Sequence, residues 1–207
     1  MGEKIRLKAA DGHAFDAYVA RPQGKPRGAV VIVQEIFGVN SHIRGVTDGY
    51  AADGYLAIAP ALFDRVQPGF ETGYKPEDIT VGRGLKDRAS LDDAVRDVAA
   101  AVEHARAGGK VAVVGYCWGG TVAWLAAARI AGLACAVPYY GGGIPEYAGE
   151  APRCPVLCHF GDKDTSPAPD AARTAVAKHA SASAHFYPAG HGFNCDQRGS
   201  YDAASSK

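Results

Sequence analysis

The stretch Val111-Ala-Val-Val-Gly115-Tyr-Cys117-Trp-Gly119-Gly120-Thr-Val-Ala-Trp124 decides the fold of this 207-residue chain. It consists of an apolar strand, a Gly-x-Cys-x-Gly turn and a helix of small and apolar residues. This is the nucleophile-elbow pattern with cysteine in place of serine. We expect the turn to strain the backbone of Cys117 and to hold its thiol at a helix N-terminus, where amide groups and the helix dipole favour a thiolate. The alternative is a buried structural cysteine in a glycine-rich turn.

Strands and helices alternate along the rest of the chain. Polar and apolar residues alternate over residues 4–8 and 14–20, which predicts a solvent-facing antiparallel hairpin. Short apolar runs without alternation are typical of strands covered on both faces, and they occupy residues 29–33, 56–59, 111–114, 135–137 and 156–158. Helical spacing or composition predicts helices over residues 41–52, 90–107, 121–130 and 168–180.

Repeated strand and helix predict an α/β fold, a mainly parallel sheet with helices on both faces. No internal repeat or linker divides the sequence, so we expect one domain over residues 1–207. Residues 64–89 form the one long irregular stretch, with several glycines and prolines. Such a stretch is either part of a substrate pocket or a surface excursion with short helices of its own.

Composition excludes several classes of protein. Lysine and arginine (22) balance aspartate and glutamate (22), so no net field attracts nucleic acid or an anionic membrane. The five cysteines are an odd number and do not suggest a disulfide framework in a chain of this length. Neither a signal peptide nor a membrane span is evident, which favours a cytoplasmic protein with free thiols and a small-molecule partner.

A cysteine nucleophile needs a base and an orienting acid, which follow the elbow in the order acid, then histidine. Asp164 lies in the turn after the apolar run that ends at Phe160, deeper than Asp162, and His191 lies between two glycines after an expected strand at residues 184–187. His191 would pair with the Cys117 thiolate and then shuttle protons, while Asp164 would fix its tautomer. We expect the histidines in hairpin or helix positions to be solvated: His13, His42, His104 and His179.

An earlier acid, Glu35, follows the first buried strand, in the loop that supplies the second oxyanion donor of this elbow architecture. The amides of Ile36 and Trp118 are the expected pair of donors. A carboxylate beside such a site would repel an arriving negative charge, which suggests that Glu35 has a specific task. The alternative is that Glu35 is a solvated loop acid without a function.

Five motifs are spread over nearly the whole chain: Gln34-Glu-Ile-Phe-Gly-Val-Asn40, Gly115-Tyr-Cys-Trp-Gly-Gly120, Tyr139-Tyr-Gly141, Gly161-x-x-Asp164 and Gly190-His191-Gly-Phe. Together they resemble the dienelactone hydrolase family of α/β-hydrolases. The resemblance implies that a Cys–His–Asp triad opens an enol-lactone through a thioester, with no metal or other cofactor. It also implies that Glu35 holds the resting thiol of Cys117 and takes its proton when substrate binds.

The sequence departs from the family at two places. Well-known members carry an arginine four residues after the histidine, where this chain has Cys195. Arg198 and Arg83 are the candidates to replace it, with Tyr139 as a wall of the pocket, so hydrolysis of an ester or lactone is expected and dienelactone itself is open. The family also continues into a closing C-terminal helix, which implies that the sequence given stops before it.

The function predicted is therefore cleavage of a small ester or lactone through Cys117. A catalytically silent hydrolase fold that binds a small molecule is the alternative, although a binding module has no need of nucleophile, acid and histidine in order. Thiol redox sensing is a third possibility and lacks a nearby resolving cysteine. Cys154 and Cys158 lack a second ligand pair at zinc spacing, which favours core thiols over a metal site.

Overall fold

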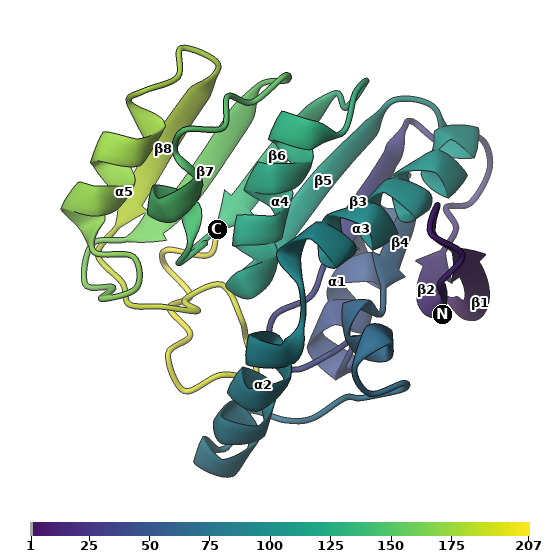
Figure 1. The fold of residues 1–207 in the computed structure, drawn as a ribbon, viewed down its shortest axis with the longest axis horizontal. Coiled ribbons are helices and arrows are strands. Elements are labelled where there is room, and N and C mark those ends of the chain that lie inside the picture. The colour runs from purple at the N-terminus through teal and green to yellow at the C-terminus, as the bar shows by residue number, and fades with distance from the viewer. Residues whose placement is uncertain (1) are drawn as a thin grey trace. The chain divides into compact units, whose positions relative to one another are not determined.

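The computed structural model describes residues 2–207, and the chain forms two compact units, one ending at Ala112 and one beginning at Val113 (Figure 1). Each unit is described by itself, and the single domain over residues 1–207 stays a prediction. Among the described residues, no helix has both the length and the apolar character needed to cross a bilayer.

The first unit holds four strands in the order β1-β2-β4-β3. The strands β1 and β2 form the predicted antiparallel hairpin, β2 pairs antiparallel with β4, and β3 pairs parallel with β4. Their bounds are Glu3–Lys8 (β1), Ala14–Ala20 (β2), Ala29–Val33 (β3) and Leu56–Pro60 (β4). The helices are α1 (Ser41–Ala52), α2 (Pro76–Arg88) and α3 (Leu91–Ala105), with short 3-10 turns at Leu62–Arg65 and Arg106–Gly108.

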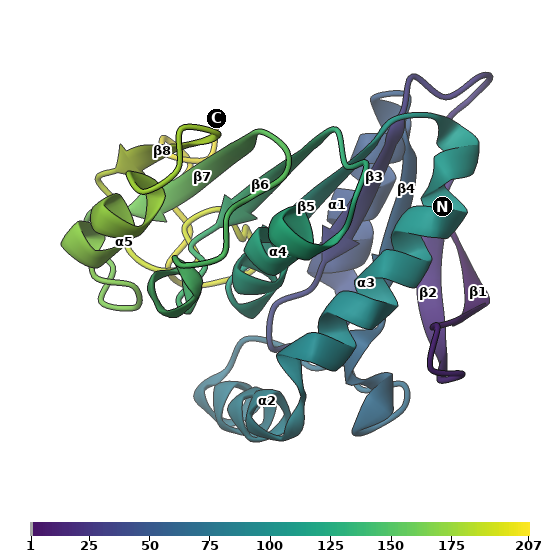
Figure 2. The same cartoon turned by 45° about the horizontal axis from the view of Figure 1, so that its top comes forward.

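Both faces of β3 and β4 are covered. All ten residues of the two strands are buried, because α1 and α3 pack on opposite faces of this part of the sheet (Figure 1, Figure 2). Local capping explains where each helix begins: the Asn40 side chain accepts the amide of Ile43 at 3.2 Å, and the Ser90 hydroxyl accepts that of Asp93 at 3.3 Å. The strands at residues 29–33 and 56–59 are therefore buried on both faces, as their composition predicts.

Residues 64–89 are not irregular throughout, because α2 occupies Pro76–Arg88. This agrees with the predicted alternative of a surface excursion with helices of its own. Proline at the first helical turn, Glu77 and Asp78 in the same turn and Arg88 in the last one suit the helix and its dipole. Only Gly82 and Leu85 are buried on α2, so the apolar periodicity that identifies a helix in sequence is almost absent.

A buried ion pair ties the 3-10 turn after β4 to α3. The Arg65 guanidinium donates to both carboxylate oxygens of Asp97, at 2.7 and 2.8 Å, and also to Asp11 in the β1–β2 turn. Asp97 is 0% exposed, and burial raises the pKa of its carboxyl even though Arg65 acts in the opposite direction. The carboxylate thus depends on Arg65 for its charged form.

Replacing Arg65 with leucine is expected to lower the free energy of unfolding by about 3–5 kcal/mol, because it leaves Asp97 buried without its partner. Urea denaturation at neutral pH measures the change. The control is Arg106→Ala, which removes an exposed pair with Glu103 and should cost less than about 1 kcal/mol. Equal losses for the two variants would contradict the assignment.

The second unit holds the strands β5-β6-β7-β8 in sequence order, and the pairs β6/β7 and β7/β8 are parallel. The strand β5 begins in the last two residues of the first unit. The strand bounds are Val111–Tyr116 (β5), Cys135–Tyr139 (β6), Val156–Gly161 (β7) and Ala182–Tyr187 (β8). The helices are α4 (Trp118–Arg129) and α5 (Pro169–Val176), with a 3-10 turn at Ile144–Tyr147.

Helices α4 and α5 cover one face of these strands (Figure 1, Figure 2). Alternate residues of β6 and β7 are buried against that side, including Ala136 and Cys158, while Tyr139 and His159 on the other face are half-exposed. The prediction that residues 135–137 and 156–158 are covered on both faces is therefore wrong. A run of three apolar residues is too short to reveal the alternation.

The two predicted helices of this unit differ from the structure at their ends. The helix α4 starts at Trp118, three residues earlier than predicted, because Cys117 already serves as its N-cap. The helix α5 ends at Val176, four residues before the predicted end. Trp124 is 0% exposed and belongs to the core, as expected.

Candidate active site

Cys117 occupies the turn between β5 and α4. It has φ +56° and ψ −118°, a strained conformation for a residue with a side chain, and its amide donates to the Tyr139 carbonyl at 3.0 Å. Two glycines make the turn possible. A Cβ on Gly115 would overlap the Gly119 carbonyl, and one on Gly120 would lie 3.0 Å from the backbone of Gly141. The local backbone therefore presents a half-buried thiol at the N-terminus of α4.

His191 and Asp164 meet in the second unit. The His191 Nδ1 lies 2.8 Å from Asp164 Oδ2, and the other carboxylate oxygen accepts the Ser166 amide at 2.8 Å. Asp164 is buried beside the histidine, whereas Asp162 is exposed. The turn and the histidine loop approach closely because residue 161 is glycine: a Cβ there would overlap the Ala189 carbonyl.

The charge state of His191 follows from its neighbours. Burial lowers the pKa of its imidazole, but the charge and hydrogen bond of Cys117 and those of Asp164 outweigh burial and raise the pKa to about 10. The imidazole of His191 is therefore protonated at neutral pH, beside the Cys117 sulfur and the Asp164 carboxyl group. Such a pair of sulfur and imidazolium supplies a nucleophile and a proton donor together.

Tyr140 is a neighbour of this histidine that sequence reasoning missed. Its ring centroid lies 5.1 Å from that of His191, it is 0% exposed, and its φ of +39° is strained. Its amide donates to the His159 carbonyl at 2.7 Å, which fixes the residue at the end of β6. The sequence holds no signal for this contact beyond the Tyr-Tyr-Gly motif.

Two of the predicted substrate contacts also lie in the second unit. The Arg198 guanidinium packs over Gly192, since a Cβ built there would lie 2.7 Å from its Cζ. It therefore lies beside the loop that carries His191. The Tyr139 ring is stacked between Tyr116 and His159, with centroids at 5.0 and 4.4 Å, so only its edge is left for a ligand.

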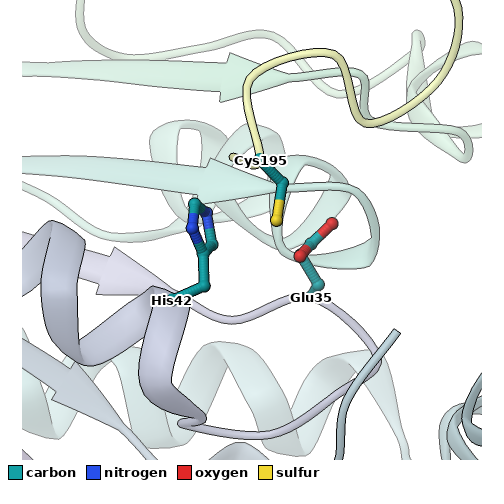
Figure 3. Close-up of side chains that lie close together, drawn as sticks. All are labelled: Glu35, His42 and Cys195. Carbon is teal, nitrogen blue, oxygen red and sulfur yellow. The ribbon is translucent and has the colours of Figure 1, made fainter. Parts of the chain in front are cut away.

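Glu35 belongs to the first unit, on the loop that leaves β3. Its side chain is 0% exposed, and Oε2 accepts the Tyr74 hydroxyl at 3.2 Å. The reading of Glu35 as a solvated loop acid is therefore wrong. Figure 3 shows Glu35 on this loop and His42 at the start of α1.

Four other residues named in the sequence predictions also have defined positions in the structure. The prediction that His42 is solvated is wrong, because it is buried at the start of α1 near the Tyr74 ring, whose centroid lies 6.4 Å away. Ile36 follows Glu35 in the first unit and is buried, whereas Arg83 lies exposed on α2. Trp118 is the first residue of α4 and is buried.

The remaining cysteines differ from Cys117 in their surroundings. Cys154, Cys158 and Cys195 are buried, and Cys135 is half-buried. Burial raises the pKa of Cys135 and Cys154, and it raises the pKa of Cys158 to about 12. These three thiols are therefore poor nucleophiles at neutral pH.

Comparisons with known proteins find similar chains over most of this sequence. The model of the dienelactone hydrolase family matches residues 15–207. A Synechocystis protein provisionally named carboxymethylenebutenolidase is 40% identical over 210 residues, 91% of this chain and 85% of its own length. The carboxymethylenebutenolidase of Pseudomonas putida is 37% identical over 171 residues, 78% of this chain and 71% of its own.

A solved structure extends the likeness to three dimensions. A protein from Klebsiella pneumoniae subsp. pneumoniae, provisionally named dienelactone hydrolase, has a TM-score of 0.83 and 33% identity, covering 99% of this chain and 94% of its own. The mainly parallel strands with helices are those of the α/β-hydrolase fold. On sequence and structure alike, the chain belongs to the dienelactone hydrolase family.

Proposed function

We propose that this hydrolase cleaves small carboxylic esters or lactones through Cys117. The observation that carries the proposal is the His191 imidazole, hydrogen-bonded to both Cys117 and Asp164 beside a strained elbow. A binding protein would have no use for a nucleophile, a proton carrier and an orienting acid that are hydrogen-bonded in sequence. Turnover of a p-nitrophenyl ester that depends on Cys117 is the direct test.

In the first half-reaction the Cys117 thiolate attacks the carbonyl carbon, and the carbonyl electron pair moves to oxygen. The amides of Trp118 and Ile36 are the proposed donors to that oxyanion. When the tetrahedral adduct collapses, the bond to the leaving oxygen breaks and His191 gives that oxygen a proton. The product is a thioester on Cys117, with the alcohol released or, for a lactone, still attached to the acyl chain.

In the second half-reaction water replaces the alcohol. Neutral His191 takes a proton from a water molecule as it attacks the thioester, and the thiolate leaves. Asp164 holds the tautomer of His191 and stabilises the imidazolium that forms again. One water is consumed and one carboxylic acid is released in each turnover.

Glu35 has a separate proposed role. In the family pattern, Glu35 holds the thiol of Cys117 in the resting protein and takes its proton when substrate binds. Its full burial and its hydrogen bond from Tyr74 support a specific task, because a carboxylate without one is rarely kept out of water. The state of the free thiol decides whether His191 or Glu35 removes the proton.

The substrate class follows from the name of the relatives and from Arg198. The name carboxymethylenebutenolidase denotes an enzyme that acts on a lactone with a carboxylate group. Because Cys195 stands where the family has arginine, we propose that Arg198 binds a substrate carboxylate, with Arg83 as the other candidate. The packing of Arg198 over Gly192, one residue from His191, supports this choice.

Replacing Arg198 with alanine is expected to raise KM for mono-p-nitrophenyl succinate by about 10- to 100-fold, the effect of losing a charge-assisted hydrogen bond. The neutral ester p-nitrophenyl butyrate should keep its KM within about threefold, since it offers no carboxylate. The same pair of substrates tested on Arg83→Ala evaluates the other arginine. Equal effects on both esters would remove Arg198 from substrate binding.

A further inference from the structure

The backbone loop that follows β3 is held by a distant stretch of the same unit, residues 70–75, here named the clasp. The Thr72 amide donates to the Phe37 carbonyl at 3.0 Å, and Gly38 forms an isolated antiparallel bridge with Glu71. The approach is close, because a Cβ on Gly38 would overlap the Phe70 carbonyl. The clasp therefore fixes the loop from one side along its backbone.

Side chains lock the clasp at both ends of the loop. Asn40 donates from Nδ2 to the Thr72 carbonyl and to the Tyr74 hydroxyl, each at 3.1 Å, and Tyr74 donates to Glu35. The Phe37 and Tyr74 rings pack edge to face at 4.6 Å. The clasp thus holds both the acid and the residues beyond it.

The clasp itself is anchored at the start of α2. The Asp78 carboxylate accepts the Thr72 hydroxyl and, at 2.9 Å, the Lys75 amide. The Thr72 hydroxyl and then the Lys75 amide keep the pKa of Asp78 below its usual value, so the anchor is a carboxylate at neutral pH. Movements of α2 and of the clasp are therefore coupled.

Gly82, in the middle of α2, lies against Ile36. A Cβ on Gly82 would overlap the Ile36 carbonyl oxygen and would lie 3.2 Å from its carbonyl carbon and its Cγ1. No positive φ requires glycine at this position, so the reason for glycine is space alone. Gly84, two residues further along the same helix, has nothing within 4 Å of such a Cβ and provides a matched comparison.

We propose that Gly82 is a positioning residue, and that the seating of α2 on Ile36 sets the direction of the Ile36 amide toward the developing oxyanion. The inference rests on the proposed function, which gives that amide its role. The carbonyl and the N–H of Ile36 belong to adjoining peptide planes joined at one Cα, so a displacement of the carbonyl that moves this Cα also shifts the plane that carries the N–H. Hydrogen bonds to an oxyanion weaken steeply with such a turn.

The test compares Gly82→Ala with Gly84→Ala. Gly82→Ala is expected to lower kcat for p-nitrophenyl acetate by about 10- to 100-fold, somewhat less than deletion of an oxyanion donor, with KM within about twofold. Binding of a trifluoromethyl ketone, which forms a tetrahedral oxyanion with the thiolate, should weaken by the same factor. Gly84→Ala should keep both constants and have an equal or higher Tm.

Alkylation by iodoacetamide separates positioning from general damage, because it needs the Cys117 thiolate but generates no oxyanion. An unchanged alkylation rate in Gly82→Ala, together with the loss in kcat, supports the proposal. Wild-type kcat, or a parallel fall of alkylation and turnover, overturns it. If Gly82→Ala does not fold, Leu85→Ala, which removes the buried anchor of the same helix, must show the same separation. Turnover by a Cys117→Ala protein would instead refute the proposed function itself.

Discussion

A Cys117→Ala protein is expected to lose turnover of p-nitrophenyl acetate by about 10⁴-fold or more, down to the rate that binding and the oxyanion donors alone provide. The loss is large because the proposed reaction proceeds through a covalent bond to this sulfur, which is hydrogen-bonded to His191. The measurement is initial rate at saturating ester, with Tm recorded to show that the fold is intact.

The control for this variant is Cys135→Ala. Cys135 is also half-buried, but burial raises the pKa of its thiol, so its loss should leave turnover within about twofold. A thioester trapped by acid quench and located on the Cys117 peptide by mass spectrometry would add direct support. Near wild-type turnover by Cys117→Ala would refute the nucleophile. Wild-type protein that neither turns over esters nor reacts with iodoacetamide would favour the small-molecule binding protein.

The second prediction concerns the ion pair of His191. Replacing His191 with alanine is expected to reduce turnover by about 10³-fold or more, because both proton transfers lose their carrier. It should also change the pH dependence of alkylation. In the wild-type protein Cys117 should react with iodoacetamide nearly as fast at pH 6 as at pH 8. Without the imidazolium the rate should fall about tenfold per pH unit below the usual thiol pKa of about 8.5.

The direction of the pH effect follows from linkage. The pKa of His191 is raised from 6.5 to about 10, so the stability that the ion pair contributes is fully present below about pH 6.5. That contribution is lost as the pH rises through about 10. Urea denaturation should therefore show wild-type stability falling over this interval more than that of His191→Ala. Identical slopes for the two proteins would contradict the ion pair.

Glu35→Gln distinguishes the two possible proton acceptors. If it keeps the flat alkylation profile while turnover falls, His191 is the partner of the thiolate in the free protein and Glu35 acts only with substrate. If the profile becomes that of an ordinary thiol, Glu35 already controls the resting state. Wild-type behaviour in both measurements would remove Glu35 from the mechanism.

Local sequence patterns determined much of this fold. The hairpin, the strands predicted at residues 29–33 and 56–59 and the helix over residues 41–52 are found where residue type alone places them. Their signals are short-range: alternation, a cap, or a turn residue. The order of cysteine, acid and histidine was also readable, because the strand ends that carry them are marked by glycines.

Other features needed the folded chain. The helix α2 has two glycines and few apolar residues, and one of those glycines exists to admit the Ile36 carbonyl. The burial of His42 and Glu35, the contact of Tyr140 with His191 and the position of Arg198 over Gly192 join residues that the sequence gives no reason to pair. Each of these contacts depends on which loops pack against one another in the folded chain.

The sequence by itself determined the chemistry offered by this protein: a cysteine on a glycine-bounded turn, followed by an acid and a histidine at the ends of later strands. Only the tertiary structure decided how that chemistry is held, with the Tyr140 ring against His191 and with α2 seated against Ile36 through Gly82. The physical reason is range. Turns, caps and strand composition act over a few residues, whereas the close approach of two backbones is fixed by the packing of elements far apart in the chain.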